Sequence, residues 1–118
     1  MHRDIRWDNV LKHIDRDKWF IIDFDDACYI SSPTSSVHLA KENHAPEIFE
    51  DYYNESVDIW SVGYLILTAT VNLQMYDELK IYTTSLMKKD ANDRPTAKDA
   101  LQWLWNKYRN ILREDFLE

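Results

Sequence analysis

The chain contains a single glycine, Gly63, which lies inside its longest apolar run, Ile59 to Val71. A loop that cradles phosphate groups needs several glycines, because only then can backbone N–H groups approach the oxygens. The sequence therefore excludes a glycine-rich nucleotide-binding loop within these 118 residues. The run is interrupted by Ser61, Gly63 and two threonines, and it is too short to span a bilayer. It predicts a buried helix at the centre of the fold.

Composition and charge limit the class of protein. The 45% hydrophobic and 14% aromatic content is enough for one packed domain. The net charge of −7 argues against nucleic-acid binding, which depends on neutralising phosphates, and no membrane contact is expected. Cys28 is the only cysteine, which excludes an intrachain disulfide and favours an intracellular, cytoplasmic location. Met1 is followed directly by charged residues, so we expect no secretory signal.

The strongest chemical signal lies in residues 2–9. His2, Arg3 and Asp4 stand together, and Asn9 follows after four further residues. This H-R-D-x-x-x-x-N pattern resembles the catalytic loop of protein kinases. The resemblance implies that Asp4 orients the attacking hydroxyl and accepts its proton, and that Asn9 holds Mg²⁺ through its side-chain oxygen. Arg6 takes the place of a lysine common in the family and is a third candidate catalytic residue.

A β-hairpin is predicted directly after this loop, because two apolar runs, 10–14 and 19–22, flank a charged turn. The second run leads into Asp23, Phe24 and Asp25, which resemble the metal-binding D-F-G motif of kinases with Asp in the third position. The resemblance implies that Asp23 is the main Mg²⁺ ligand and contacts ATP, together with Asn9, while Phe24 is structural. Asp4, Asn9 and Asp23 should then meet at the open end of the hairpin.

Three further motifs follow in the order found in kinases: A-P-E at 45–47, D-x-W-S-x-G at 58–63 and R-P-T at 94–96. By resemblance, the first closes an activation segment over 23–47, and the second opens a central helix over about 57–70. The third begins a last helix over about 96–116. The resemblance also implies that Arg94 pairs with Glu47, and that Asp58 hydrogen-bonds the catalytic loop, in which His2 and Arg3 are structural.

Local patterns add detail to this outline. Thr96 and Asp99 predict a capping box at the start of the last helix. Hydroxyl residues at 31–36 suggest phosphorylation in the activation segment, where the added charge would pair with Arg3. A helix is also expected over 76–87. The buried stripe of the last helix is predicted from its apolar residues: Ala97, Ala100, Leu101, Leu104, Trp105, Tyr108, Ile111 and Leu112.

Together the motifs predict a mainly α fold, a partial domain over 1–118 that resembles the C-terminal lobe of a protein kinase. A small β-hairpin would carry the catalytic and metal loops. We expect the N-terminal lobe, with its glycine-rich loop and its phosphate-binding lysine, to be absent. Phosphoryl transfer from ATP and Mg²⁺ to a protein substrate should then be negligible unless a partner chain supplies that lobe. The central helix should expose an apolar face where the missing part would pack.

Two other functions stay open. One is a pseudokinase-like binding module without catalysis, which Mg²⁺-dependent nucleotide binding would distinguish. The other is a small-molecule phosphotransferase of the aminoglycoside or choline kinase type. Those enzymes share H-x-D-x-x-x-x-N and a strand end like residues 22–26, but they lack the three later motifs. Serine/threonine or tyrosine preference is also open, because Ala40 and Asn43 stand where protein kinases often have Thr and an aromatic residue.

Overall fold

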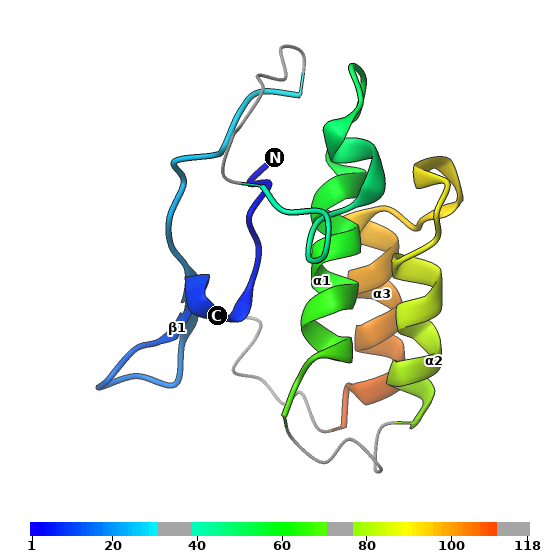
Figure 1. Cartoon of the computed structure of the whole chain (residues 1–118). Coiled ribbons are helices and arrows are strands. Elements are labelled where there is room, and N and C mark those ends of the chain that lie inside the picture. Colours follow the sequence, from blue (N-terminus) through cyan, green and yellow to red (C-terminus); the bar gives the residue numbers. More distant parts are fainter. Residues whose placement is uncertain (31–38, 71–76, 111–118) are drawn as a thin grey trace.

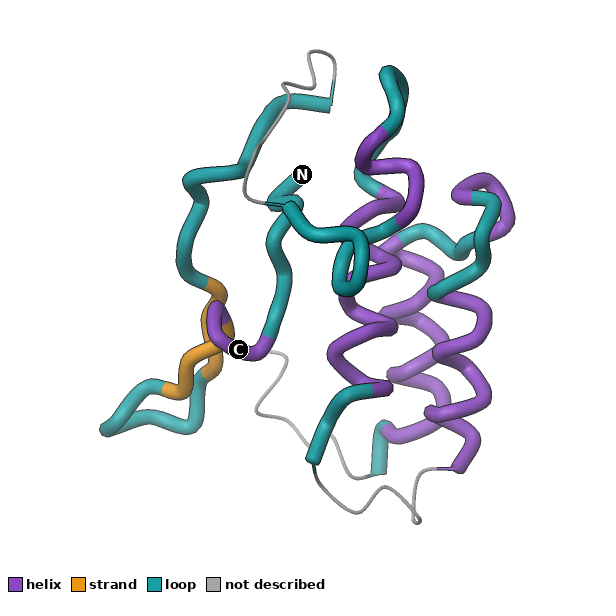
Figure 2. Tube along the Cα trace, in the orientation of Figure 1, coloured by secondary structure: helices purple, strands orange, loops and turns teal. Residues whose placement is uncertain are grey.

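The computed structural model describes residues 1–30, 39–70 and 77–110 (Figure 1). Three helices lie together, α1 (Ser56–Leu67), α2 (Asp77–Leu86) and α3 (Ala97–Tyr108). The N-terminal segment lies on the side of α1 that faces away from α2, and the hairpin lies farther out beyond it (Figure 2). Within the described ranges, the expectation of a mostly helical chain with one two-stranded hairpin is confirmed. No helix in those ranges is both long and apolar enough to cross a membrane.

The hairpin pairs β1 (Val10–Lys12) with β2 (Trp19–Ile21) in antiparallel register, and Val10 lies opposite Ile21. Both strands are shorter than the predicted runs. Beyond the last pair, the N–H of Ile22 donates to the carbonyl of Asn9 over 2.9 Å. The chain therefore leaves the hairpin with the end of the catalytic loop and the start of the metal motif side by side.

Helix α1 supports the N-terminal segment and ends at Leu67, before the expected residue 70. Gly63 is buried against the end of α2: a Cβ there would lie 2.6 Å from Met87 Cγ and 3.0 Å from Leu86 Cβ. A glycine at this position therefore lets the two helices approach closely. Exposed large apolar side chains of α1 are limited to Val62 and Leu67, a smaller apolar face than expected.

The hydrophobic core lies between α1 and the 3₁₀ helix η2 (Pro46–Phe49). Ala45, Ile48 and Val57 are its buried members. Burying side chains the size of Ile48 and Val57 contributes on the order of 1.5–3 kcal/mol each. The core thus holds the A-P-E motif against the first turn of α1. Partly buried side chains pack around it: Met1, Leu39, Tyr53 and Trp60.

The N-terminus of α3 has the predicted capping box: the Thr96 hydroxyl accepts from the Asp99 N–H over 3.1 Å, and the Asp99 carboxylate accepts from the Thr96 N–H. The predicted buried stripe is wrong at Ala97 and at Leu101, which are exposed, Leu101 by 64%, and no described residue of α3 is fully buried. Trp103 faces α2 instead and stacks on Tyr82 with ring centroids 3.9 Å apart. Residues two apart on a helix point in nearly opposite directions, so Leu101 faces away. Residues 111–118 of the expected helix lie outside the described ranges.

Candidate active site

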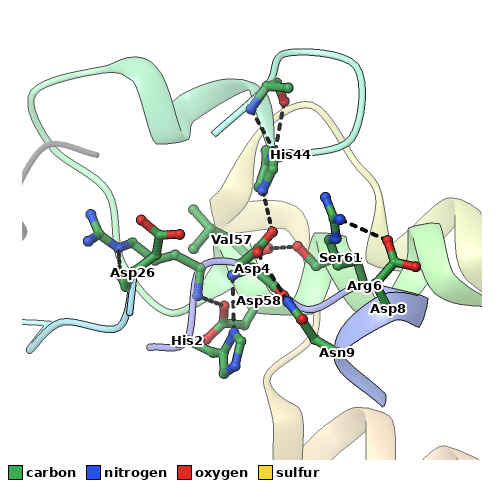
Figure 3. A network of polar contacts seen from close by, with 12 residues as sticks. His2, Asp4, Arg6, Asp8, Asn9, Asp26, His44, Val57, Asp58 and Ser61 are labelled. Atoms are coloured by element: carbon green, nitrogen blue, oxygen red, sulfur yellow. Dashed lines mark hydrogen bonds and ion pairs between the residues drawn. The ribbon is translucent and has the colours of Figure 1, made fainter. Parts of the chain in front are cut away.

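The catalytic loop is attached to α1 through Asp58, in the helix's first turn (Figure 3). One carboxylate oxygen accepts from the backbone N–H of His2 over 2.7 Å, and the other accepts from that of Arg3 over 2.8 Å. Hydrogen bonds to an ionised carboxylate are stronger than those between neutral groups. Asp58 therefore anchors the start of the loop, in the position that the resemblance implies.

The His2 ring connects the catalytic loop to the metal motif. Its Nε2 lies 3.0 Å from the Ile22 carbonyl oxygen, and its Nδ1 accepts from the Asp4 N–H over 3.1 Å. A neutral ring with its proton on Nε2 satisfies both contacts. The ring also packs edge-on against Phe24, with centroids 4.8 Å apart. The two loops are thus held together by one buried side chain.

Arg3 is buried, and its guanidinium donates from Nε to the Asp26 carbonyl and from Nη1 to the Tyr53 hydroxyl over 2.8 Å. Arg3 (φ 72°) and Asp23 (φ 61°) are the two non-glycine residues with left-handed backbone in the described ranges. Such strain persists only where the surroundings enforce it, and it often marks functional sites. The hydroxyls suggested to pair with Arg3 on phosphorylation, in 31–36, lie outside the described ranges.

Asp4 and Asn9 form the centre of the site. The Asn9 side-chain nitrogen donates to both the carbonyl oxygen of Asp4, over 2.9 Å, and its carboxylate Oδ2, over 3.1 Å. This fixes the buried Asn9 amide so that its Oδ1 is the atom left to face a cation. The Asp4 carboxylate is 15% exposed, which leaves it within reach of a substrate hydroxyl.

A residue that the sequence reasoning missed, His44, completes this cluster. Its Nε2 lies 3.0 Å from the other carboxylate oxygen of Asp4, Oδ1 (Figure 3). The only signal in the sequence is its place directly before the A-P-E motif. Because that motif is packed in the core, a residue next to it is carried to a fixed position.

Arg6 forms an ion pair within the loop. Its guanidinium pairs with Asp8 over 2.7 Å, and both side chains are largely exposed. Between them in sequence, Trp7 donates its indole N–H to the carbonyl of Leu65, near the end of α1, over 3.1 Å. Trp7 thus ties the second half of the loop to the same helix that holds the first half.

Asp23 is exposed and follows Ile22, whose N–H is bonded to the Asn9 carbonyl. Its Oδ1 accepts from the N–H of Asp25 over 3.3 Å, in a turn that begins with left-handed backbone. An amide oxygen and a carboxylate suit Mg²⁺, which commonly binds one or two protein oxygens and keeps several waters. Among the described residues, no three His, Cys, Asp or Glu side chains cluster for a metal ion. The Ile22–Asn9 main-chain hydrogen bond brings these two oxygen-bearing residues to neighbouring points of the chain.

A buried ion pair between Arg94 and Glu47 links three segments of the fold. The two side chains form a bidentate ion pair, and the Arg94 side chain is 0% exposed. Arg94 also donates to the carbonyl of Lys88 over 2.8 Å and to that of Ser56 over 2.9 Å. One guanidinium thereby joins η2, the start of α1 and the segment before α3.

Apolar surface surrounds the metal motif and the hairpin. A cavity of about 500 Å³ lies beside the motif, lined by Met1, His2, Phe24, Ala27, Cys28 and Tyr29. The hairpin, with its turn, exposes five large apolar side chains: Leu11, Ile14, Trp19, Phe20 and Ile21. By the strand register, Leu11 and Phe20 lie on one face of the hairpin, and Trp19 and Ile21 lie on the other.

Comparison with known proteins places this geometry in a family. Residues 1–83 match the protein kinase domain family. Crinkler effector protein 8 of Phytophthora infestans is 45% identical over 111 residues, covering 88% of this chain and 18% of that protein. The probable serine/threonine-protein kinase WNK9 of Oryza sativa subsp. japonica is 31% identical over 97 residues, 82% of this chain and 23% of its own length. Serine/threonine-protein kinase WNK8 of Arabidopsis thaliana is 32% identical over 96 residues, 80% of this chain and 17% of its own length. The chain thus spans about a fifth of the length of these relatives.

Proposed function

Because this chain belongs to the protein kinase family, we propose that it carries one half of an active site for phosphoryl transfer from ATP to protein hydroxyls. That half corresponds to the C-terminal lobe of the kinase domain. The observation that carries the proposal is the locked pair of Asp4 and Asn9, held on α1 by Asp58. Phosphoryl transfer depends mainly on positioning and charge stabilisation, and such a rigid polar cluster supplies both.

Each residue of the cluster has a distinct task in this proposal. Asp4 orients the substrate hydroxyl and accepts its proton on a carboxylate oxygen. Asn9 Oδ1 and the Asp23 carboxylate hold Mg²⁺, which supplies charge neutralisation at the phosphate oxygens when bound. His2 keeps the two loops in register through its contacts with Ile22 and Phe24. Arg6, paired with Asp8, has a supporting role at most.

The other half of the site must come from elsewhere, because these 118 residues contain no glycine-rich loop. We propose that another segment, from the same polypeptide or from a partner, supplies it. The exposed apolar side chains of the hairpin and the cavity beside Phe24 support a docking role for this side of the molecule. Residues 1–118 alone should therefore show negligible turnover.

The names of the relatives bear on the acceptor and on the location. Since WNK9 and WNK8 are described as serine/threonine kinases, we propose serine or threonine hydroxyls as acceptors. The family match supports a protein acceptor over a small molecule. Dependence on ATP, together with the free thiol of Cys28, supports an intracellular, cytoplasmic location.

A second candidate is a binding module that has lost catalysis. Two observations favour it: Asp25 adds negative charge where the family has glycine, and Arg6 is engaged with Asp8 rather than with the central cluster. Carboxylates near the metal motif would weaken binding of the phosphate groups by like-charge repulsion. The two candidates differ in whether Asn9 and Asp23 bind a divalent cation.

Titration of the chain with Mn²⁺, a paramagnetic substitute for Mg²⁺, tests this difference. In NMR spectra, the proposal predicts selective broadening of resonances around Asn9 and Asp23, reversed by Mg²⁺ and lost in Asn9→Ala and Asp23→Asn. Asp17→Asn, on the exposed hairpin turn, is the matched control. Broadening that is absent or spread evenly over acidic residues would favour the binding module. Phosphorylation of a protein substrate by residues 1–118 alone would disprove the claim that the chain needs a second lobe.

A further inference from the structure

His44 is a buried, titratable side chain to which the proposed function assigns no role. It comes from the segment before the A-P-E motif, whereas its partner Asp4 comes from the catalytic loop (Figure 3). The His44 side chain is 3% exposed, so it cannot itself touch a protein substrate. Any effect it has on the reaction must therefore pass through Asp4.

The partners of the ring define its hydrogen bonding. The Nε2 of His44 faces Oδ1 of Asp4 at 3.0 Å, and an ionised carboxylate can only accept, so Nε2 carries a proton. On the opposite side, Nδ1 lies 3.1 Å from the Ala40 nitrogen and 2.8 Å from the Ala40 carbonyl oxygen. Nδ1 accepts from the N–H when it is unprotonated and donates to the carbonyl when it is protonated. The ring is thus held between the main chain of Ala40 and the carboxylate of Asp4.

The Asp4 carboxylate is consequently held by two different segments. Oδ1 receives the His44 contact, and Oδ2 receives the Asn9 side-chain nitrogen over 3.1 Å. Each oxygen has a second lone pair, so one acceptor position on each stays open for a substrate hydroxyl. Removing the donor from His44 would free the carboxylate to rotate about its side-chain bonds. Among the described residues, the Asn9 amide would then be its remaining side-chain donor.

We propose that His44 is a positioning residue for Asp4, donating from Nε2 to Oδ1 and making the orientation of this carboxylate depend on the segment that leads into A-P-E. The role rests on the proposed function, since it assumes that Asp4 receives the substrate hydroxyl. Ala40, four residues earlier, contributes only its main chain to the arrangement. The donor to Oδ1 of Asp4 therefore comes from one side chain, which a single substitution can remove.

NMR of the isotopically labelled chain tests the contact without any need for turnover. We expect His44 to have its proton on Nε2, and its Hε2 resonance to shift in Asp4→Asn but not in Asp8→Asn. We also expect the Asp4 Cγ resonance to shift in His44→Asn, whose amide reaches Ala40 but not Asp4. His44→Gln places a donor near the Nε2 position and should restore the wild-type Cγ resonance. An unprotonated Nε2, or the same Asp4 Cγ resonance in all three forms, would overturn the proposal.

A kinetic signature separates positioning from simple structural support. In an assembly of this chain that transfers phosphate, His44→Asn should lower kcat by roughly 10- to 100-fold, as small misplacements of a reacting group do. The KM for ATP should stay unchanged, and His44→Gln should recover most of kcat. Equal kcat in His44→Asn and wild type would refute the role. Failure of Asn9 and Asp23 to bind Mn²⁺ would instead sink the proposed function, while the His44–Asp4 contact would still be observed.

Discussion

The guanidinium of Arg94 lies against the carboxylate of Glu47, with Nη2 2.9 Å from Oε2, although the two residues are 47 positions apart in sequence. Removing one member of a buried ion pair leaves an uncompensated charge, which costs about 3–5 kcal/mol. Arg94→Leu also leaves the carbonyls of Lys88 and Ser56 without this donor. We therefore expect Arg94→Leu to lower the free energy of unfolding by at least that amount, and Glu47→Gln to lower it less. Urea denaturation followed by circular dichroism measures both.

The exposed Lys12–Asp17 pair provides the control for this comparison, with N and O 2.9 Å apart. Surface pairs contribute up to about 1 kcal/mol, so Asp17→Asn should be nearly neutral. If Arg94→Leu cost no more than Asp17→Asn, the Arg94–Glu47 pair would not hold the fold together.

Asp58→Asn tests how the catalytic loop is anchored. The substitution keeps one acceptor oxygen but turns the other into an NH₂ group that faces a backbone N–H. Hydrogen bonds to charged groups are worth about 1.5–3 kcal/mol, and we expect a loss of that size. The amide protons of His2 and Arg3 should exchange with solvent faster, as measured by hydrogen–deuterium exchange. Glu55→Gln, next to the helix start but without a capping hydrogen bond, should leave both rates unchanged.

Gly63→Ala tests the close approach of α1 and α2. The added Cβ would meet Met87 Cγ at 2.6 Å and Leu86 Cβ at 3.0 Å. Overpacking of this kind costs about 1–3 kcal/mol, which exceeds or cancels the helix-propensity gain of about 1 kcal/mol. Thermal unfolding should show a lower Tm, and Met87→Ala in the Gly63→Ala background should recover part of it. A Tm for Gly63→Ala above that of wild type would contradict the contact.

Tyr82 should make unfolding depend on pH in the alkaline range. Burial, and next the negative charge of Asp99, raise the pKa of Tyr82 above its usual 10.0. The unfolded chain then loses this proton first, so the stability contribution is complete below pH 10.0 and is lost as the pH rises through the raised pKa. Tyr82→Phe keeps the ring stacked on Trp103 but should remove this part of the pH dependence. Denaturation of both forms on either side of pH 10.0 measures the difference. An identical slope in both would contradict the shift.

Several contacts that hold the fold together could be predicted from the sequence motifs, because each motif contains a residue whose hydrogen-bond or ion-pair partner is known from its spacing or from the family. The ion pair of Arg94 with Glu47, the position of Asp58 beneath the loop and the Thr96 capping box followed from spacing and resemblance. The hairpin followed from its two apolar runs, although its strands are shorter than predicted. These features depend on short-range patterns or on contacts that recur through a family.

The remaining features depend on how separate segments meet, which spacing does not reveal. His44 reaches Asp4 because the main chain before A-P-E curves toward the catalytic loop, and no periodicity in residues 39–45 indicates that path. Leu101 was predicted to face inward, but Trp103 turns toward α2 instead. The reason is its aromatic partner on α2, Tyr82, on which it stacks. The sequence did not indicate the partner of Arg6, which is Asp8, brought close by the turn of η1 (Trp7–Asn9).

The anchor from Asp58 uses N–H groups that every amino acid except proline possesses. The side chains of residues 2 and 3 are therefore not needed for this anchor, and they make other contacts. His2 packs against Phe24, and Arg3 donates to Asp26 and Tyr53. A substitution of either side chain could therefore change which residues the loop contacts while the hydrogen bonds to Asp58 remain. Proline, which has no N–H, would break the anchor at either position.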